Sequence, residues 1–193
     1  MRIQLNLKYW LVFCWAILMP LMVKAAPSQW VIVPSESQLT FTGTQNDAPV
    51  TGEFKTFTGE ILVDPNDLSV GKIDIVVDIA SLNTSYADLK ETLLTSDWFN
   101  PKLFPKAEFK ATQFKQTGKN AYEAAGTLTI RDKSAPVTLN FTAQGLDPNK
   151  RQVVGSTVIK RSTFGVGQGE WASTDTVKDE VTVKFKVVAI KKT

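Results

Sequence analysis

Residues 126–143, GTLTIRDKSAPVTLNFTA, contain two short runs in which apolar and polar side chains alternate. In the first run Leu128 alternates with threonines and is followed by Ile130, and in the second Val137, Leu139 and Phe141 alternate with threonine and asparagine. Successive side chains of a strand point to opposite faces, so each run has one apolar and one polar face. The stretch predicts a β-hairpin, and other strands must cover its apolar face because a lone hairpin is unstable in water.

The break between the two runs, residues 132–136, reads DKSAP and predicts the hairpin loop. Pro136 has no amide hydrogen to donate to a neighbouring strand. We therefore expect Pro136 at the start of the second strand and not within it.

The same alternation recurs along the chain and predicts about eight or nine strands in total. Besides the hairpin, strand patterns occupy residues 30–33, 38–42, 50–63, 72–79, 107–112, 153–159 and 181–187. Gly52 and Gly59 lie inside the pattern at 50–63, where glycine usually marks a bulge or a sharp bend. Short strands without alternating helices predict an all-β domain, an antiparallel barrel or a sandwich.

One segment departs from the strand pattern. Apolar residues between Tyr86 and Leu94 fall at helical spacing, and Ser85 with Asp88 resembles an N-terminal cap. We expect a single helix there, inserted midway along the chain.

The first residues predict a secretory signal peptide. Arg2 and Lys8 precede a short apolar run that ends before Lys24, and small residues follow. The run is shorter than the roughly 20 residues that span a bilayer, so an anchor is not expected. We expect cleavage after Ala25, which gives a leader over 1–25, one domain over 26–193 and a periplasmic or secreted location.

Removal of the leader changes the chemistry that the chain can offer. The three basic residues of 1–25 account for the whole net charge of +3, so the remainder is neutral and predicts no nucleic-acid partner. The single cysteine, Cys14, lies inside the leader and lacks the small neighbours of a lipid-attachment site. With no histidine in the chain, cysteine–histidine and serine–histidine catalysis and the usual zinc and copper sites are excluded.

Carboxylates give no stronger signal. Asp74 and Asp78 share one polar strand face and are expected to be solubilising charges. Asp64 and Asp67 flank a short proline-containing segment that is better explained as a turn than as a calcium loop. The sequence therefore predicts no cofactor, no metal site and no catalytic residue.

The apolar faces have two possible roles. Their aromatic residues fill a packed core, or they line a cavity, since a barrel of about eight strands is wide enough for one small ligand. Arg161 follows a strand and precedes a glycine-bearing loop, so it is either an anchor for an anionic or polar head group or a member of an ion pair.

Five ordered motifs resemble a known family. They are VTGEFKTFTG at 50–59, TSDWF at 95–99, FPKAEF at 104–109, the hairpin at 126–139 and RSTFG at 161–165. Together they are similar to the YceI-like family, exported bacterial proteins that bind polyisoprenoids and similar amphiphilic chains. The resemblance covers nearly the whole chain after the leader, although the histidines common in relatives are absent.

The resemblance implies a single lipocalin-like antiparallel β-barrel of about eight strands with one α-helix inserted mid-chain. It implies a periplasmic lipid-binding protein that carries or sequesters an isoprenoid, quinone-like or fatty-acyl chain without transforming it. The alternatives are an interaction module with a filled barrel and, third, a lipid-modifying enzyme. No stable membrane insertion is expected, and the oligomeric state stays open, a dimer included. The ligand-binding residues predicted in this way are Phe41, Phe54, Phe57, Leu94, Trp98, Phe99, Phe109, Leu128, Ile130, Phe141, Arg161 and Phe164.

Overall fold

The computed structural model describes residues 27–64 and 67–192. The predicted leader and its cleavage site lie outside these residues. Within them, no helix has the length and hydropathy needed to cross a membrane.

Eleven strands and one α-helix make up the described chain, together with short 3-10 helices. The strands are β1 (Ser28–Ile32), β2 (Gln38–Gln45), β3 (Ala48–Phe54), β4 (Phe57–Val63), β5 (Lys72–Asp78), β6 (Leu82–Thr84), β7 (Lys106–Gln116), β8 (Ala121–Ile130), β9 (Lys133–Asp147), β10 (Lys150–Lys160) and β11 (Glu180–Lys191). The helix is α1 (Ala87–Leu93), and the 3-10 helices are η1 (Pro34–Glu36), η2 (Leu68–Val70), η3 (Ile79–Ser81), η4 (Arg161–Phe164) and η5 (Gly169–Trp171).

The strands close into an antiparallel barrel. Neighbours follow the order β1-β4-β5-β7-β8-β9-β10-β11, and pairing of β11 with β1 completes a ring of eight. β2, β3 and β6 continue three of these eight strands after short interruptions. β11, for example, pairs with β1 near the C-terminal end of β11 and with β2 nearer the N-terminal end of β11. The predicted lipocalin-like barrel with one mid-chain helix is confirmed, and the two or three extra strands come from these interruptions.

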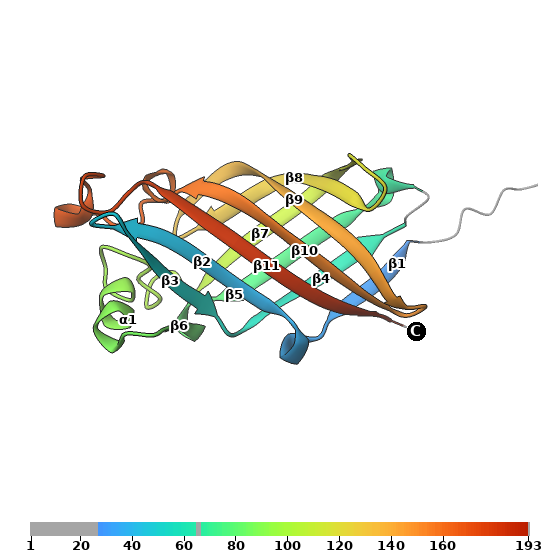
Figure 1. The fold of residues 1–193 in the computed structure, drawn as a ribbon, viewed down its shortest axis with the longest axis horizontal. Coiled ribbons are helices and arrows are strands. Elements are labelled where there is room, and N and C mark those ends of the chain that lie inside the picture. The colour runs from blue at the N-terminus through green and yellow to red at the C-terminus, as the bar shows by residue number, and fades with distance from the viewer. Residues whose placement is uncertain (1–26, 65–66, 193) are drawn as a thin grey trace, which may run out of the picture.

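The two ends of the barrel differ. Figure 1 shows α1 beside β6 at one end, with the segment after β10 at the same end, and the C-terminus at the other. We call the α1 end the capped end and the opposite end the β9–β10 end. The β9–β10 turn and the end of β11 lie together there, because Lys191 donates a backbone hydrogen bond to Asn149.

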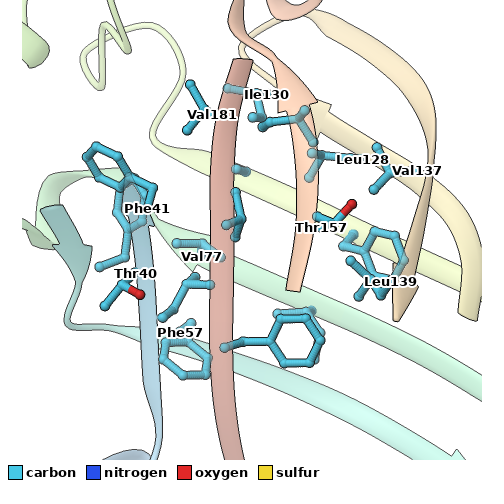
Figure 2. A pocket seen from close by; sticks show the side chains of 18 of the residues that line it. Thr40, Phe41, Phe57, Val77, Leu128, Ile130, Val137, Leu139, Thr157 and Val181 are labelled. Carbon is cyan, nitrogen blue, oxygen red and sulfur yellow. The ribbon is translucent and has the colours of Figure 1, made fainter. Parts of the chain in front are cut away.

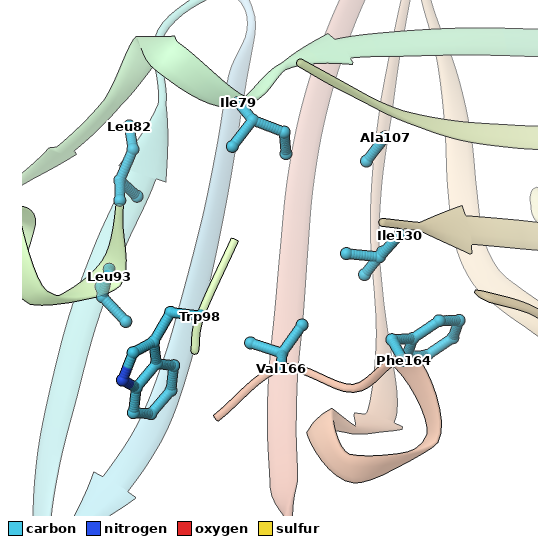
Figure 3. Packing of buried hydrophobic residues seen from close by; sticks show 8 residues of the cluster. All are labelled: Ile79, Leu82, Leu93, Trp98, Ala107, Ile130, Phe164 and Val166. Carbon is cyan, nitrogen blue, oxygen red and sulfur yellow. The ribbon is translucent and has the colours of Figure 1, made fainter. Parts of the chain in front are cut away.

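A cluster of buried side chains closes the capped end (Figure 3). Its members come from η3, β6, α1, the loop that follows α1, β7, β8 and the segment from η4 onward. They are Ile79, Leu82, Leu93, Trp98, Ala107, Ile130, Phe164 and Val166. This cluster is the larger of two, and a smaller one from β7 and β8 consists of Phe109, Ala111 and Ala124.

The hairpin forms, but its turn is shorter than expected. β8 ends at Ile130 and β9 begins at Lys133, with Arg131 in the left-handed region at a φ of 57°. Pro136 therefore lies inside β9, opposite Thr127 of β8, and its predicted place at the strand start is wrong. Pro136 is tolerated because β9 pairs with β10 only from Asn140 onward. No backbone hydrogen bonds to β10 are therefore needed at Pro136.

The predicted helix cap is also wrong. α1 begins at Ala87, and Tyr86 precedes it without a side-chain cap. The hydroxyl of Thr84 donates to the carbonyl of Tyr86 at 2.7 Å, so the turn before the helix is held by Thr84 and not by Ser85. Tyr86 points outward and is 73% exposed, because the apolar face of the helix begins only at Leu89.

Gly52 and Gly59 do not form bulges, since the strand registers run through both positions without a shift. A Cβ atom at Gly52 would lie 2.4 Å from the ring of Phe41, and one at Gly59 would lie 2.3 Å from Ile75. Glycine is needed at these positions because a cross-strand neighbour occupies the space of a side chain.

Gly155 of β10 gives a measurable case of the same effect. An added Cβ would lie 2.4 Å from the carbonyl oxygen of Asn140 and 2.5 Å from the ring of Phe185. We expect Gly155→Ala to lower the free energy of unfolding by about 1–3 kcal/mol, the usual cost of overpacking. Gly43→Ala is the control, because its Cβ would meet nothing closer than 4.0 Å. Urea denaturation compares the two, and equal losses of stability would contradict the packing explanation.

Candidate functional site: the barrel cavity

The barrel encloses a cavity of about 650 Å³. Side chains that face inward on alternate positions of the strands line it, as the period of a strand requires. Figure 2 shows Phe41 and Phe57 on one side of the lumen and Leu128 and Leu139 on the other. The volume falls in the range of about 300–1,000 Å³ that small-molecule sites occupy. The apolar strand faces thus line a cavity, while packed clusters of buried side chains occupy the capped end and the region between β7 and β8.

Three phenylalanines form an aromatic group on the side of the cavity near α1. The ring centroids of Phe41 and Phe54 lie 5.7 Å apart, and Phe99 meets Phe54 edge-on at 5.6 Å. These rings come from β2, β3 and the loop after α1. Edge contacts of this kind stabilise the position of each ring and leave flat apolar surface toward the lumen.

Eleven of the twelve predicted ligand-binding residues line this cavity. Leu94 is the exception, because it lies just past the end of α1 and packs against the buried cluster, while Leu89 and Leu93 face the lumen. Residues four apart share one face of a helix, whereas the residue after Leu93 is turned away from that face.

Sequence reasoning missed several lining residues. Trp30, Tyr122, Trp171 and Arg151 line the cavity without having been predicted, whereas Ala143 lines it as expected from its position two residues after Phe141 on the same strand face. Strand parity relative to Val153 also places Arg151 inward. Trp30 lies in β1, a strand too short for the alternation of its residues to show which face points inward.

Arg161 is a structural residue. Its side chain is 3% exposed, and its guanidinium donates to five backbone carbonyls. Nε donates to Lys178 at 3.2 Å; Nη1 donates to Val166 and Gly167 at 3.1 and 3.0 Å; Nη2 donates to Ser173 and Val177 at 2.9 and 2.8 Å. An arginine has five N–H donors, so none remains for a ligand. Arg161 therefore does not serve as a head-group anchor in this structure, and no carboxylate forms an ion pair with it among the described residues.

The five hydrogen bonds fix the segment between β10 and β11. Gly167 has a φ of 78°, and a Cβ there would lie 2.4 Å from Nη1 of Arg161. The same glycine donates its backbone N–H to Asp97, which joins this segment to the loop after α1. Burial lowers the pKa of the Arg161 guanidinium and the charge of Asp179 opposes that effect. Arg161 thus organises the capped end of the barrel around a buried cation.

Arg131 holds the same end from the β8–β9 turn. Its guanidinium donates to the carbonyls of Ser96 at 2.8 Å and of Trp98, and it lies 5.1 Å from the centre of the Phe104 ring. Two arginines therefore attach both covering segments to the barrel.

Asp179 gives the capped end a dependence on pH. Burial raises the pKa of its carboxyl, but hydrogen bonds from Ser162 and the charges of Arg161 and Lys160 outweigh burial and lower the pKa below its usual value. The backbone N–H of Ser162 donates to the carboxylate at 3.0 Å. Because the folded-state pKa is the lower one, this carboxylate stabilises the fold above the unfolded-state pKa of about 3.9, and the contribution is lost as the pH falls through the folded-state pKa.

We therefore expect Asp179→Asn to be less stable than the wild type at pH 7 and to lose less stability on acidification. The difference between the two proteins should narrow below about pH 4. Urea denaturation from about pH 7 to about pH 2.5 measures it, with Asp175→Asn as a control. A constant difference across this range would show that the carboxylate charge contributes nothing.

Few charged residues face the cavity. Apart from Arg161, they are Asp88 and Lys178 near the capped end and Arg151 at the β9–β10 end. Lys178 is exposed and lies 3.5 Å from Asp47. In the part of the chain that the structure describes, no three His, Cys, Asp or Glu residues are grouped as metal ligands. The geometry is that of an apolar container with polar residues at its ends.

Comparison with known proteins agrees with this geometry. The family profile described as a YceI-like domain matches residues 30–189, which is most of the chain. The chain belongs to the YceI-like family. Solved structures that resemble it include BcnA of Burkholderia cenocepacia, 32% identical over 81% of this chain and 98% of that one, with a TM-score of 0.77.

Further similarities extend the comparison. The YCEI protein of Campylobacter jejuni is 26% identical over 76% of this chain and 86% of its own, with a TM-score of 0.66. A UPF0312 protein of Photorhabdus laumondii is 34% identical over 50% of this chain and 51% of its own length. The match thus spans about half of that curated relative, and 65% of a UPF0312 protein of Vibrio vulnificus. A polyisoprenoid binding domain of Saccharophagus degradans shares the fold at 16% identity, with a TM-score of 0.68.

Proposed function

We propose that this protein binds the apolar chain of an isoprenoid, quinone-like or fatty-acyl molecule inside its barrel and carries or sequesters it in the periplasm. The observation that carries the proposal is the cavity of about 650 Å³, which is lined by apolar side chains along the barrel. The family membership supports the same chemistry, as does the fold shared with the Saccharophagus polyisoprenoid binding domain. The location rests on the leader predicted over 1–25.

The cavity favours binding over the role of a filled interaction module. Packed protein interiors contain few voids larger than a water molecule. An apolar space of this size is costly to leave empty, because its lining lacks contacts on one side. A chain of methylene groups supplies those contacts at about 0.8 kcal/mol for each buried CH₂.

We propose further that the ligand is held and not transformed. The chain has no histidine, and its single cysteine lies in the predicted leader. Asp88 is the one carboxylate among the residues that line the cavity in the described structure, and it is solvent-exposed at the rim. An exposed carboxylate without a paired acid or base is a poor proton-transfer catalyst.

Tryptophan fluorescence tests the proposal directly. Trp30, Trp98 and Trp171 line the cavity, so a chain that enters should change their emission. We expect exported protein stripped of lipid to bind farnesol or hexadecanol with one molecule per chain, and the alcohol to be recovered unchanged. Failure of both alcohols, of hexadecanoate and of farnesyl phosphate to change the emission would contradict the proposed function, and a converted product would indicate an enzyme.

A further inference from the structure

The β9–β10 end of the cavity carries a cation without an anionic partner among the described residues. Arg151 lies at the start of β10 and lines the cavity near Gln144, Gly145 and Asn120. Its guanidinium carbon lies 5.4 Å from the centre of the Trp30 ring, which supports one face of the group. Stacking on an aromatic ring fixes the plane of an arginine but leaves its in-plane N–H donors available.

The donors of Arg151 are not taken up by the rest of the described chain. Its Nε is buried without a hydrogen-bond partner, and no Asp or Glu of the described residues lies within 4 Å of the guanidinium as an ion pair. A buried donor without an acceptor costs about 1–3 kcal/mol, so an unpaired one requires an explanation. Arg131 also has a buried Nε without a partner, but its Nη1 donates to two carbonyls and it does not line the cavity. Arg161 does line the cavity and has all five donors bonded, so Arg151 is the cavity-lining arginine whose donors are left for an anion.

A β-bulge lies beside Arg151, between β9 and β10. The register between β9 and β10 shifts between Lys150 and Arg151, so that Lys150 faces Asp147, Arg151 faces Gly145, and Leu146 is left as the extra residue. Bulges at barrel rims re-aim side chains toward sites. Here Lys150 forms an ion pair with Glu36 at 2.8 Å, while the next residue, Arg151, lines the lumen. Gly145 opposite Arg151 has no side chain to cover it; an added Cβ would lie 3.5 Å from Nη1.

We infer that the β9–β10 end is a head-group site for an anionic amphiphile, in which Arg151 binds a phosphate or carboxylate while the chain extends toward the capped end. This inference rests on the proposed function and names the ligand class of the same cavity. A guanidinium binds either oxyanion through two parallel hydrogen bonds, which are about twice as strong as neutral ones. Gln144 and Asn120 also line the cavity and are exposed, and both carry side-chain amide donors.

Matched pairs of ligands test the inference. Farnesyl phosphate and farnesol share a chain, as do hexadecanoate and hexadecanol, so each pair isolates the head group and the two pairs separate phosphate from carboxylate. For at least one pair, we expect the wild type to bind the anion at least about tenfold more tightly than the alcohol with the same chain. Arg151→Gln should remove that preference and leave the affinity for the alcohol within about twofold, whereas Arg151→Lys should keep part of it.

The control is Lys150→Gln, which removes the same charge from the neighbouring residue that pairs with Glu36. It should change the preference for the anion by less than about threefold, since its charge lies away from the lumen. Thermal melting of each variant checks the fold, and Arg151→Lys keeps the test valid if the glutamine variant unfolds.

Two results would overturn the inference while leaving the proposed function intact. The first is an anion that binds no more tightly than its alcohol to the wild type. The second is that Arg151→Gln loses affinity for the anion and for the matched alcohol by the same factor. If no alcohol or anion binds the wild type at all, the proposed function itself is wrong.

Discussion

Ala143→Trp is expected to abolish binding of a long chain while leaving the barrel folded. Ala143 of β9 lines the cavity, so an indole at this position enters the lumen. If the ring excludes about four methylenes, the loss is about 3 kcal/mol at about 0.8 kcal/mol for each, or more than about 100-fold in affinity. Because the lumen has empty volume, the added ring should not incur the overpacking cost of about 1–3 kcal/mol that a filled core imposes.

The control is Thr142→Trp, which places the same ring one residue earlier on the outward face of β9, where the side chain is exposed. Titration with hexadecanol and urea denaturation are measured on both variants. A strong loss of stability in Ala143→Trp with no loss of binding would mean that the barrel interior is filled and that the ligand binds elsewhere.

Arg161→Ala is expected to cause the largest loss of stability of any charged-residue substitution at the capped end. Five backbone carbonyls between Val166 and Lys178 lose their donor; two of these hydrogen bonds are buried and three are partly buried. At about 1–3 kcal/mol for each buried group left unpaired, the free energy of unfolding should fall by more than about 3 kcal/mol. Arg161→Lys should recover little of it, because one ammonium with three donors cannot reach carbonyls on both sides of a planar guanidinium.

Lys160→Ala, one residue earlier and exposed, is the matched control and should stay within about 0.5 kcal/mol of the wild type. Hydrogen exchange locates the effect, which should be greatest at residues 161–179. A loss of head-group preference with no change in stability or exchange would restore Arg161 as a ligand anchor and contradict its structural role.

Most of the correct predictions about the barrel come from the alternation of apolar and polar residues along its strands. A period of two assigns each residue of a strand to one face, so the pattern alone is enough to place Phe41, Phe109, Leu128 and Phe141 inward. Alternation does not report what lies across the lumen, however. The difference between a packed core and a cavity depends on the diameter that eight paired strands impose, which is a property of the closed ring.

The polar residues were harder to predict, because their roles depend on distant backbone. Arg161 precedes a glycine-bearing loop, which is compatible with a ligand anchor, and only the folded positions of Ser173 and Val177 show that carbonyls take up its donors. Arg151 is the opposite case. Parity with Val153 places it inward, but its unpaired Nε and its contact with Trp30, more than a hundred residues away, leave no local pattern in the sequence.

Native mass spectrometry of the exported protein, purified without detergent, tests whether the barrel holds an amphiphile. We expect a population whose mass exceeds that of the bare chain by one lipid, which is released as an intact molecule on activation and is reduced in Ala143→Trp. Compact ions of the bare chain alone, in protein that also fails to take up added hexadecanol or farnesol, would contradict it.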